Sequence, residues 1–333
     1  MQNFWNKIKL IWTDTSLRKK VLFVLFALIV FRLLSAIPIP GIDTIELSRF
    51  LSNNQFFGIL NIFSGGGLSN LSIIMLGVGP YITGSIIMQL LTIMVPSLKR
   101  IYHEEGEAGR KRFAQYSRLL TVPLAAIQGF SLLYILEQQN ILVNLTTFDR
   151  ITNLLIVIAG SILIMWIGEL VSEFGIGNGV SLIIFAGIVS QLPSWVSQHI
   201  FTFDVSQIPL YLVFAVISII ILAGIVLVTE AERPIPVTYA KRVRGMKMYG
   251  GGSTYLPLRV NQAGVIPIIF ALSILLFPQM IGTFLSRFND GILHSISGVL
   301  LKFTQTSILY AVLYFIFVFL FTYFYTAVTF DPE

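Results

Sequence analysis

Residues that could carry covalent or metal chemistry are few and scattered along this chain. There is no cysteine, which removes disulfides, thiolate metal sites and cysteine nucleophiles together. The three histidines, His103, His199 and His294, are far apart and form no His-Glu-x-x-His zinc motif, and no Gly-x-Ser-x-Gly hydrolase motif is present. We therefore expect no enzyme activity, no metal and no cofactor. A nucleotide-binding loop is also missing, so a partner must supply the energy for any transport.

Glu169 and Glu173 stand one helical turn apart and resemble a carboxylate pair for acid–base chemistry. They lie at the end of a long apolar segment, directly before the turn at Gly175. This position favours a solvated helix end over a catalytic pair.

The composition is that of a membrane protein. Hydrophobic residues make up 55% of the chain and charged residues 11%, with a mean hydropathy of +0.83. A soluble domain carries about a quarter charged residues. The solvent for most of this chain is therefore lipid, and one bundle of membrane-spanning helices is expected.

Eight segments are long and apolar enough to cross a bilayer, which takes about 20 residues of helix. They are residues 21–37, 74–95, 113–136, 151–170, 180–197, 208–229, 263–285 and 307–328. The pattern predicts an all-α polytopic membrane protein.

The basic residues are distributed unequally between the two sides of these spans. Of 22 Lys and Arg, five precede span 1, six lie between spans 2 and 3, and six lie between spans 6 and 7. Only Arg49, Arg150, Arg287 and Lys302 fall on the other side, and Arg32 lies inside span 1. By the positive-inside rule both ends of the chain are cytoplasmic. This asymmetry, and not nucleic-acid binding, explains the net charge of +6.

One apolar stretch is too short to cross. Residues 56–64 are followed by three glycines at 65–67. Irregular backbone in a membrane must be buried in protein or line a water-filled cavity. We expect a re-entrant half-helix packed inside the bundle from the outer side, with a surface loop helix as the alternative.

Spans 2 and 7 are both interrupted by Gly and Pro, and they stand five spans apart. Matched broken helices indicate a transport path in proteins built from inverted repeats. The spacing predicts two five-helix halves, residues 1–200 and an incomplete 201–333. The alternative is that Gly and Pro only let helices pack closely.

The residues available to line such a path on spans 2, 5 and 7 are Val78, Ile82, Ile188 and Ile269. A ring of branched aliphatic side chains resists water and ions by dewetting. A secondary transporter, the alternative function, would place ionisable groups there. Aliphatic residues in a span are ordinarily core or lipid-facing, and without further information that is the better explanation of these four.

Ten short motifs, in order along the chain, resemble the SecY family of protein-conducting channels. They are IPIPG (37–41), NIFSGG (61–66), GPYI (79–82), QLL (89–91), EGEAGR (105–110), GIGNG (175–179), EAER (230–233), YAKR (239–242), LPLRVN (256–261) and AGVIP (263–267).

The resemblance implies a clamshell of two pseudo-symmetric halves around an hourglass pore, with a gate that opens sideways to lipid. Val78, Ile82, Ile188 and Ile269 match the constriction ring. The half-helix, about residues 58–67, matches a plug formed by Gly58, Ile59, Leu60, Asn61, Ile62, Phe63, Ser64, Gly65 and Gly66. Gln89, Thr92 and Asn261 lie near the gate, where they either hold it shut by hydrogen bonds or satisfy local backbone.

The resemblance also implies partners. A cytoplasmic loop at about residues 230–260 matches the docking site for the ribosome or the SecA ATPase. Its basic residues are Arg233, Lys241, Arg242, Arg244, Lys247 and Arg259. Expected partners further include the SecE and SecG subunits, signal peptides, nascent polypeptides and lipid, in the bacterial plasma membrane. Family members have ten spans, so the last two are expected to be missing here.

Overall fold

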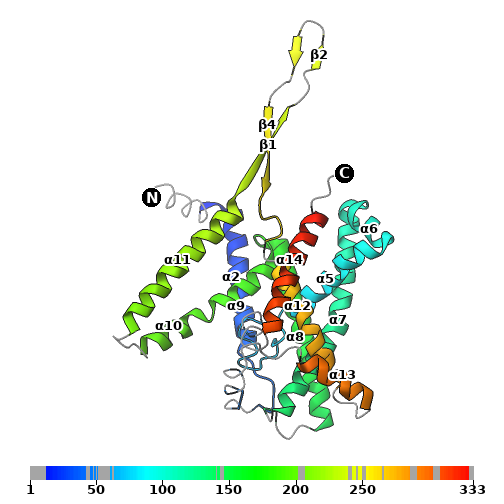
Figure 1. Ribbon diagram of the computed structural model, residues 1–333, viewed down its shortest axis with the longest axis vertical. Helices are drawn as coiled ribbons and strands as arrows, with labels where there is room; N and C mark the ends of the chain where they lie inside the picture. Colours follow the sequence, from blue (N-terminus) through cyan, green and yellow to red (C-terminus); the bar gives the residue numbers. More distant parts are fainter. Residues whose placement is uncertain are drawn as a thin grey trace. The chain divides into compact units, whose positions relative to one another are not determined.

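The computed structural model describes residues 13–329 apart from short stretches. Those stretches are residues 43–45, 48, 50, 52–60, 62–63, 140, 143–145, 202–206, 239–241, 245–246, 250–252, 265, 286–290 and 303–307. Contacts divide the chain into two compact units, Met1–Gln198 with Leu276–Gln305, and His199–Leu275 with Thr306–Glu333. Figure 1 shows the helices and strands that make up these units. The division into halves at residue 200 stays a prediction.

The first unit is a helical bundle. Its helices are α2 (Thr15–Ser35), α5 (Gly79–Met94), α6 (Pro96–His103), α7 (Gly106–Gln138), α8 (Thr147–Phe174), α9 (Gly179–Val189) and α13 (Gly291–Lys302). The second unit contains α11 (Ile208–Glu230), α14 (Ile308–Thr329) and four strands. Helices α10 (Leu192–Phe201) and α12 (Ile266–Leu285) run across the division between the units.

Local signals explain where several helices begin. The Asp14 side chain accepts hydrogen bonds from the backbone N–H groups of Ser16 and Leu17 at the start of α2. Thr146 and Asp149 form a reciprocal capping box at the start of α8. Both arrangements satisfy N–H groups that have no partner inside the helix.

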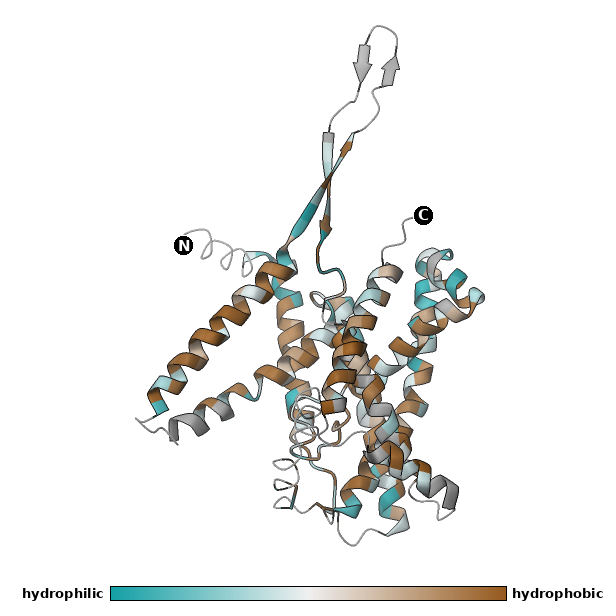
Figure 2. Cartoon of the chain, in the orientation of Figure 1, coloured by the Kyte–Doolittle hydropathy of each residue, from teal (hydrophilic) through white to brown (hydrophobic). Residues whose placement is uncertain are grey.

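Helices occur at all eight predicted positions. Among the described residues, four helices are long and apolar enough to cross a membrane, or five if α5 and α6 form one bent span. Helix α11 is apolar on every side, with none of its residues buried (Figure 2). Such a helix suits lipid and not water, so the membrane assignment of the sequence agrees with the structure.

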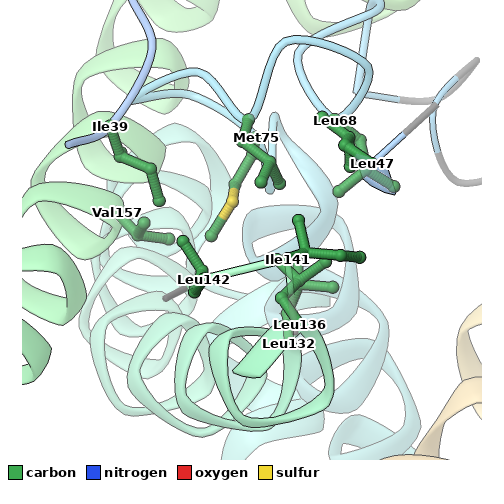
Figure 3. Packing of buried hydrophobic residues seen from close by; sticks show 10 residues of the cluster. Ile39, Leu47, Leu68, Met75, Leu132, Leu136, Ile141, Leu142 and Val157 are labelled. Atoms are coloured by element: carbon green, nitrogen blue, oxygen red, sulfur yellow. The ribbon is translucent and has the colours of Figure 1, made fainter. Parts of the chain in front are cut away.

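A buried apolar cluster holds the loops of the first unit against α7 and α8 (Figure 3). Ile39 and Leu47 enter from the chain after α2, and Leu71 and Met75 from the segment before α5. Their partners from α7, the loop after it and α8 are Leu132, Leu136, Ile141, Leu142 and Val157, and Leu68 completes the cluster. Non-helical chain is thus packed inside the helical bundle.

Two predicted spans differ from the observed helices. Span 2 was expected from residue 74, but α5 begins at Gly79 and residues 74–78 form turns. Gly77 has a φ of +54°, a left-handed conformation that interrupts an α-helix, and Pro80 then stands in the first turn of α5. Span 5 was expected over 180–197, but α9 ends at Val189 and α10 starts at Leu192.

The predicted loop at 230–260 contains strands that the sequence reading missed. Strand β1 (Glu232–Thr238) pairs antiparallel with β4 (Ser253–Arg259), and β2 (Arg242–Arg244) pairs with β3 (Lys247–Tyr249). Pro234 lies opposite Pro257, and Pro236 lies opposite Tyr255. The hydrogen bond from the Val260 N–H to the Ala231 carbonyl makes residues 231 and 260 a hydrogen-bonded pair. Such pairs alternate with non-hydrogen-bonded pairs along an antiparallel ladder, and the three prolines fall in the latter, where no N–H donor is needed.

Candidate functional site

The candidate site centres on a buried irregular segment, Ser64–Val78, between the predicted half-helix and α5. Eleven of its fifteen residues are buried, and all are in turns or a single bridge. Backbone groups in such a place must find partners inside the protein. The partners come from α2, α8 and the segment itself.

The chain after α2 provides one support for this segment. The N–H of Ile39 donates to the carbonyl of Leu71 at 2.9 Å, and the N–H of Ile73 donates to the carbonyl of Ile37 at 3.0 Å. Leu71 itself is fully buried with a φ of +39°, which is unusual for a residue with a side chain. A short two-stranded contact therefore fixes the segment to the end of α2.

Helix α8 provides a second support through two adjacent small residues. A Cβ added at Gly160 would lie 1.9 Å from the carbonyl oxygen of Ile73. The hydroxyl of Ser161 donates to the carbonyl of Gly77 at 3.1 Å. No larger side chain would let the irregular backbone approach α8 this closely.

Two of the four predicted ring residues lie together. Val78 is 2% exposed and packs in a cluster with Phe31, Ile74, Ile164 and Ile183, and Ile82 lies at the edge of that cluster. This cluster joins the irregular segment to α2, α8 and α9 without any charged side chain.

The other two predicted ring residues belong to α9 and α12. Ile188 lies in the last turn of α9 and is 45% exposed. Ile269 lies in α12, and its side chain is outside the described part of the structure. The complete ring stays a prediction.

The predicted plug is described only at its C-terminal end. Gly58, Ile59, Leu60, Ile62 and Phe63 lie outside the described residues. The carbonyl of Asn61 accepts from the N–H of Gly66 at 2.8 Å, and its side-chain oxygen accepts from the N–H of Ser69, also at 2.8 Å. The Ser64 hydroxyl accepts from the N–H of Leu68 at 3.2 Å. These bonds tie Asn61 to the compact turn at Ser64–Ser69.

The predicted gate residues make local hydrogen bonds. The hydroxyl of Thr92 donates to the carbonyl of Gln89 at 2.6 Å within α5. The side-chain oxygen of Asn261 accepts from the N–H of Gly264 at 3.0 Å, in the turn before α12. Of the two roles left open for Thr92 and Asn261, these contacts support the satisfaction of local backbone.

An apolar groove of about 510 Å³ lies along α5, α6 and α7. One of its lining residues, Leu91, directly precedes Thr92 in α5. Its lining is formed by Ile87, Met88, Leu91, Leu98, Tyr116, Leu119, Leu120 and Pro123. The sequence reading missed this groove, because apolar residues on membrane helices are too common to mark one.

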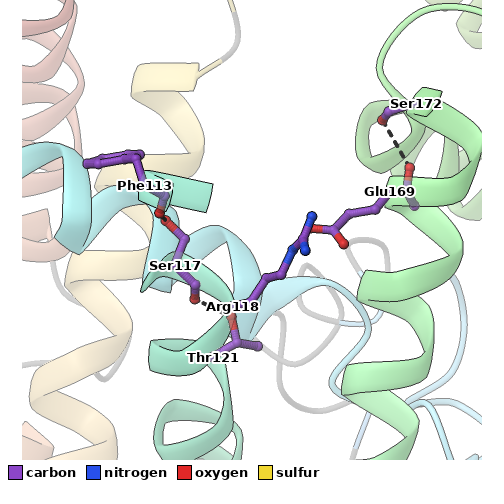
Figure 4. A network of polar contacts seen from close by, with 7 residues as sticks. Phe113, Ser117, Arg118, Thr121, Glu169 and Ser172 are labelled. Carbon is purple, nitrogen blue, oxygen red and sulfur yellow. Dashed lines mark hydrogen bonds and ion pairs between the residues drawn. The ribbon is translucent and has the colours of Figure 1, made fainter. Parts of the chain in front are cut away.

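Polar contacts join α8 to α7 and to α9 near the predicted cytoplasmic ends of α7 and α8 (Figure 4). The Arg118 guanidinium of α7 forms an ion pair with the Glu169 carboxylate of α8. The Ser172 hydroxyl donates to the Gly168 carbonyl at 3.0 Å and accepts from the N–H of Gly179 at 2.8 Å. Glu169 is therefore a paired residue between helices, and not simply part of a solvated helix end. No group of three or more acidic or histidine residues in the described ranges could hold a metal.

The predicted docking residues fall on the strands or beside them. Arg233 and Arg259 are exposed on β1 and β4, and their register places them on opposite faces of the ribbon. Arg242, Arg244 and Lys247 lie on β2 and β3, and Lys241 lies outside the described residues.

Known proteins with similar sequences belong to one family. The family profile described as SecY matches residues 72–333. The chain is 41% identical to the protein translocase subunit SecY of Streptomyces galbus, over 95% of this chain and 75% of that protein. It is 39% identical to the subunit of the same name from Buchnera aphidicola, over 99% of this chain and 76% of that protein.

Solved structures with a similar fold are also channels. A structure titled as a protein conducting channel has a TM-score of 0.60 at 20% identity, covering 92% of this chain and 70% of that one. Sec61 in the canine ribosome-channel complex has a TM-score of 0.53 at 20% identity, covering 90% and 72%.

Proposed function

Because this chain belongs to the SecY family, we propose that it is the central subunit of a protein-conducting channel, one that passes unfolded polypeptides across the membrane and releases transmembrane helices sideways into lipid. The observation that supports this most is the irregular segment Ser64–Val78, buried within a helical membrane bundle. Irregular backbone at membrane depth is tolerated only where protein buries it or where it lines a water-filled cavity, and a closed channel provides both.

The apolar residues near this segment support a conduit over a solute transporter. The cluster around Val78 and Ile82 consists of branched aliphatics and one phenylalanine. A carrier of ions or sugars would present hydrogen-bonding or charged groups at this depth. We assign Val78, Ile82, Ile188 and Ile269 to the constriction, and residues 58–66 to the plug.

The groove along α5, α6 and α7 extends the proposal to the signal sequence. A signal peptide or new transmembrane segment is an apolar helix, and helices bind in apolar grooves through residues at helical spacing. The gate near Gln89, Thr92 and Asn261 would then open next to the groove.

The remaining assignments concern partners and location. The β1–β4 ribbon, with Arg233 and Arg259, is the proposed docking site for the ribosome or the SecA ATPase. SecE and SecG are the proposed companion subunits. We place the protein in the bacterial plasma membrane, with the N-terminus and the ribbon in the cytoplasm, where the basic residues concentrate.

Transport by reconstituted protein tests this function. The natural protein, purified with its companion subunits, is inserted into vesicles with the motor ATPase, ATP and a secretory precursor. We expect the precursor to become protected from external protease. A lack of protection under conditions where a known translocase succeeds, together with accumulation of a small solute, would favour the transporter.

A further inference from the structure

Arg32, the charged residue inside the first span, reaches the end of the predicted plug. Its Nη1 atom lies 3.4 Å from the carbonyl oxygen of Gly65 and 3.3 Å from the hydroxyl oxygen of Ser190. The hydroxyl of Ser35 is 3.5 Å from the same nitrogen. One cationic nitrogen thus faces oxygens from α2, from the plug turn and from the end of α9.

The backbone at Gly65 fits tightly against the same two helices. A Cβ added there would lie 2.3 Å from Cζ of Phe31 on α2 and 3.3 Å from Cα of Gly187 on α9. Gly65 also has a φ of +72°, which favours glycine. The turn is therefore placed by shape as well as by the arginine.

Electrostatics favour a cation at this point. Arg32 lies in the last turn of α2, and Ser190 is the C-cap of α9. The C-terminal end of a helix carries partial negative charge, so one guanidinium is attracted to two helix ends as well as to the Gly65 carbonyl. Ser190 is held for this contact, because its hydroxyl donates to the Gly187 carbonyl at 2.7 Å.

We infer that Arg32 is a latch for the plug. In the resting channel its side chain holds the Gly65 turn against the ends of α2 and α9, and the contact breaks when the plug moves aside. The inference rests on the proposed channel function. It makes Arg32 a positioning residue, which acts on the closed state and not on the translocating polypeptide.

Ion flux through the resting channel tests the latch, using the natural protein with its companion subunits in vesicles that contain no precursor. We expect Arg32→Leu to raise the flux about tenfold, the change that loss of one charge-assisted hydrogen bond produces in a two-state equilibrium. Arg32→Lys keeps the positive charge between the two helix ends and should stay within about twofold of the original. Ser190→Ala removes one acceptor and should give an intermediate flux.

Arg150→Leu is the matched control. Arg150 is an arginine on the predicted outer side, and it pairs with Glu137 of α7, so its loss should leave the flux unchanged. The amount of protein in the vesicles and its melting temperature identify variants that fail to fold. If Arg32→Leu does not reach the membrane, Ser190→Ala decides the question.

Deletion of residues 58–64 separates failure of the latch from failure of the channel. If this deletion raises the flux but Arg32→Leu, or Ser190→Ala in its place, does not, the latch is wrong and the channel stands. Equal leak in Arg32→Lys and Arg32→Leu would also overturn the latch, because the charge would then be irrelevant. If neither the deletion nor the arginine variants leak, and no precursor is transported, the proposed function fails as well.

Discussion

The hydroxyl of Ser161 donates a hydrogen bond of 3.1 Å to the main-chain carbonyl of Gly77, about four turns along α8 from its capped start. The next residue toward that start, Gly160, leaves no room for a side chain against the Ile73 carbonyl. Helix α8 therefore fixes the irregular backbone that leads directly to Val78.

Gly160→Ala should push residues 73–78 away from α8. An added Cβ would lie 1.9 Å from a carbonyl oxygen, so either the segment or the helix must move. We expect a loss of stability of about 1–3 kcal/mol, as for other overpacked sites. Thermal unfolding of the purified complex in detergent measures the effect.

The control for this variant is Gly224→Ala in α11. Gly224 is also a helical glycine, but a Cβ there would meet nothing within 4 Å. Alanine favours helix over glycine by about 1 kcal/mol, so stability should stay equal or rise slightly. Equal melting temperatures for the two variants would show that Gly160 is not a tight contact.

The ion pair between Arg118 and Glu169 should contribute a small coupling between α7 and α8. The Glu169 side chain is 19% exposed and that of Arg118 is 45% exposed, so solvent screens the attraction. We expect a coupling of about 0.2–1 kcal/mol. A double-mutant cycle with Arg118→Gln and Glu169→Gln, read by thermal unfolding, measures it, and strictly additive single effects would contradict the pairing.

Thr92→Val should have little effect on gate opening. The Thr92 hydroxyl donates to the Gln89 carbonyl of its own helix, so it holds no contact that an opening gate must break. The loss of this local bond should cost no more than about 1 kcal/mol of stability. Opening of the channel by a signal peptide, measured as ion conductance, is the readout, and a strong change in the peptide concentration required would assign Thr92 to the gate after all.

Arg233→Glu should weaken docking at the β1–β4 ribbon. The side chain is exposed, and the residue opposite it is Leu258, so its charge is available to an acidic partner. The difference in binding between the variant and the original protein should shrink as salt rises, because exposed charges are screened. Cosedimentation with ribosomes or with the motor ATPase measures this. Thr238→Glu, at the far end of β1, adds negative charge to the ribbon elsewhere and is the control for a general change of charge. Similar binding by Arg233→Glu and the original protein would remove this arginine from the site.

Much of this fold could be predicted from the sequence, because lipid imposes a simple rule. Long apolar segments must be helical, and helices were found at all eight expected positions. The late start of α5 was missed because residues 74–78 are as apolar as the helix that follows. The left-handed conformation at Gly77 separates the two, and a backbone φ angle cannot be predicted from the presence of a glycine alone.

The contacts around the site were harder to predict than its residues. Arg32 stood out in the sequence as a charge inside a span, but its partners Gly65 and Ser190 are 33 and 158 residues away along the chain. The β1–β4 ribbon was missed for another reason. Prolines are rare in strands, so the three in this basic loop gave no sign of pairing, although in a two-stranded ribbon they occupy positions that need no N–H donor.

A cysteine at Ile82 tests the channel most directly. The chain has no cysteine of its own, so a single Ile82→Cys variant carries one reactive thiol. A secretory polypeptide with one cysteine is stalled during transport and then oxidised. The account predicts a disulfide between Ile82→Cys and the stalled polypeptide, and none with Ile217→Cys on α11, a helix with no buried residue. No adduct at residue 82, while the polypeptide is demonstrably stalled within the complex, would contradict a path through this part of the protein.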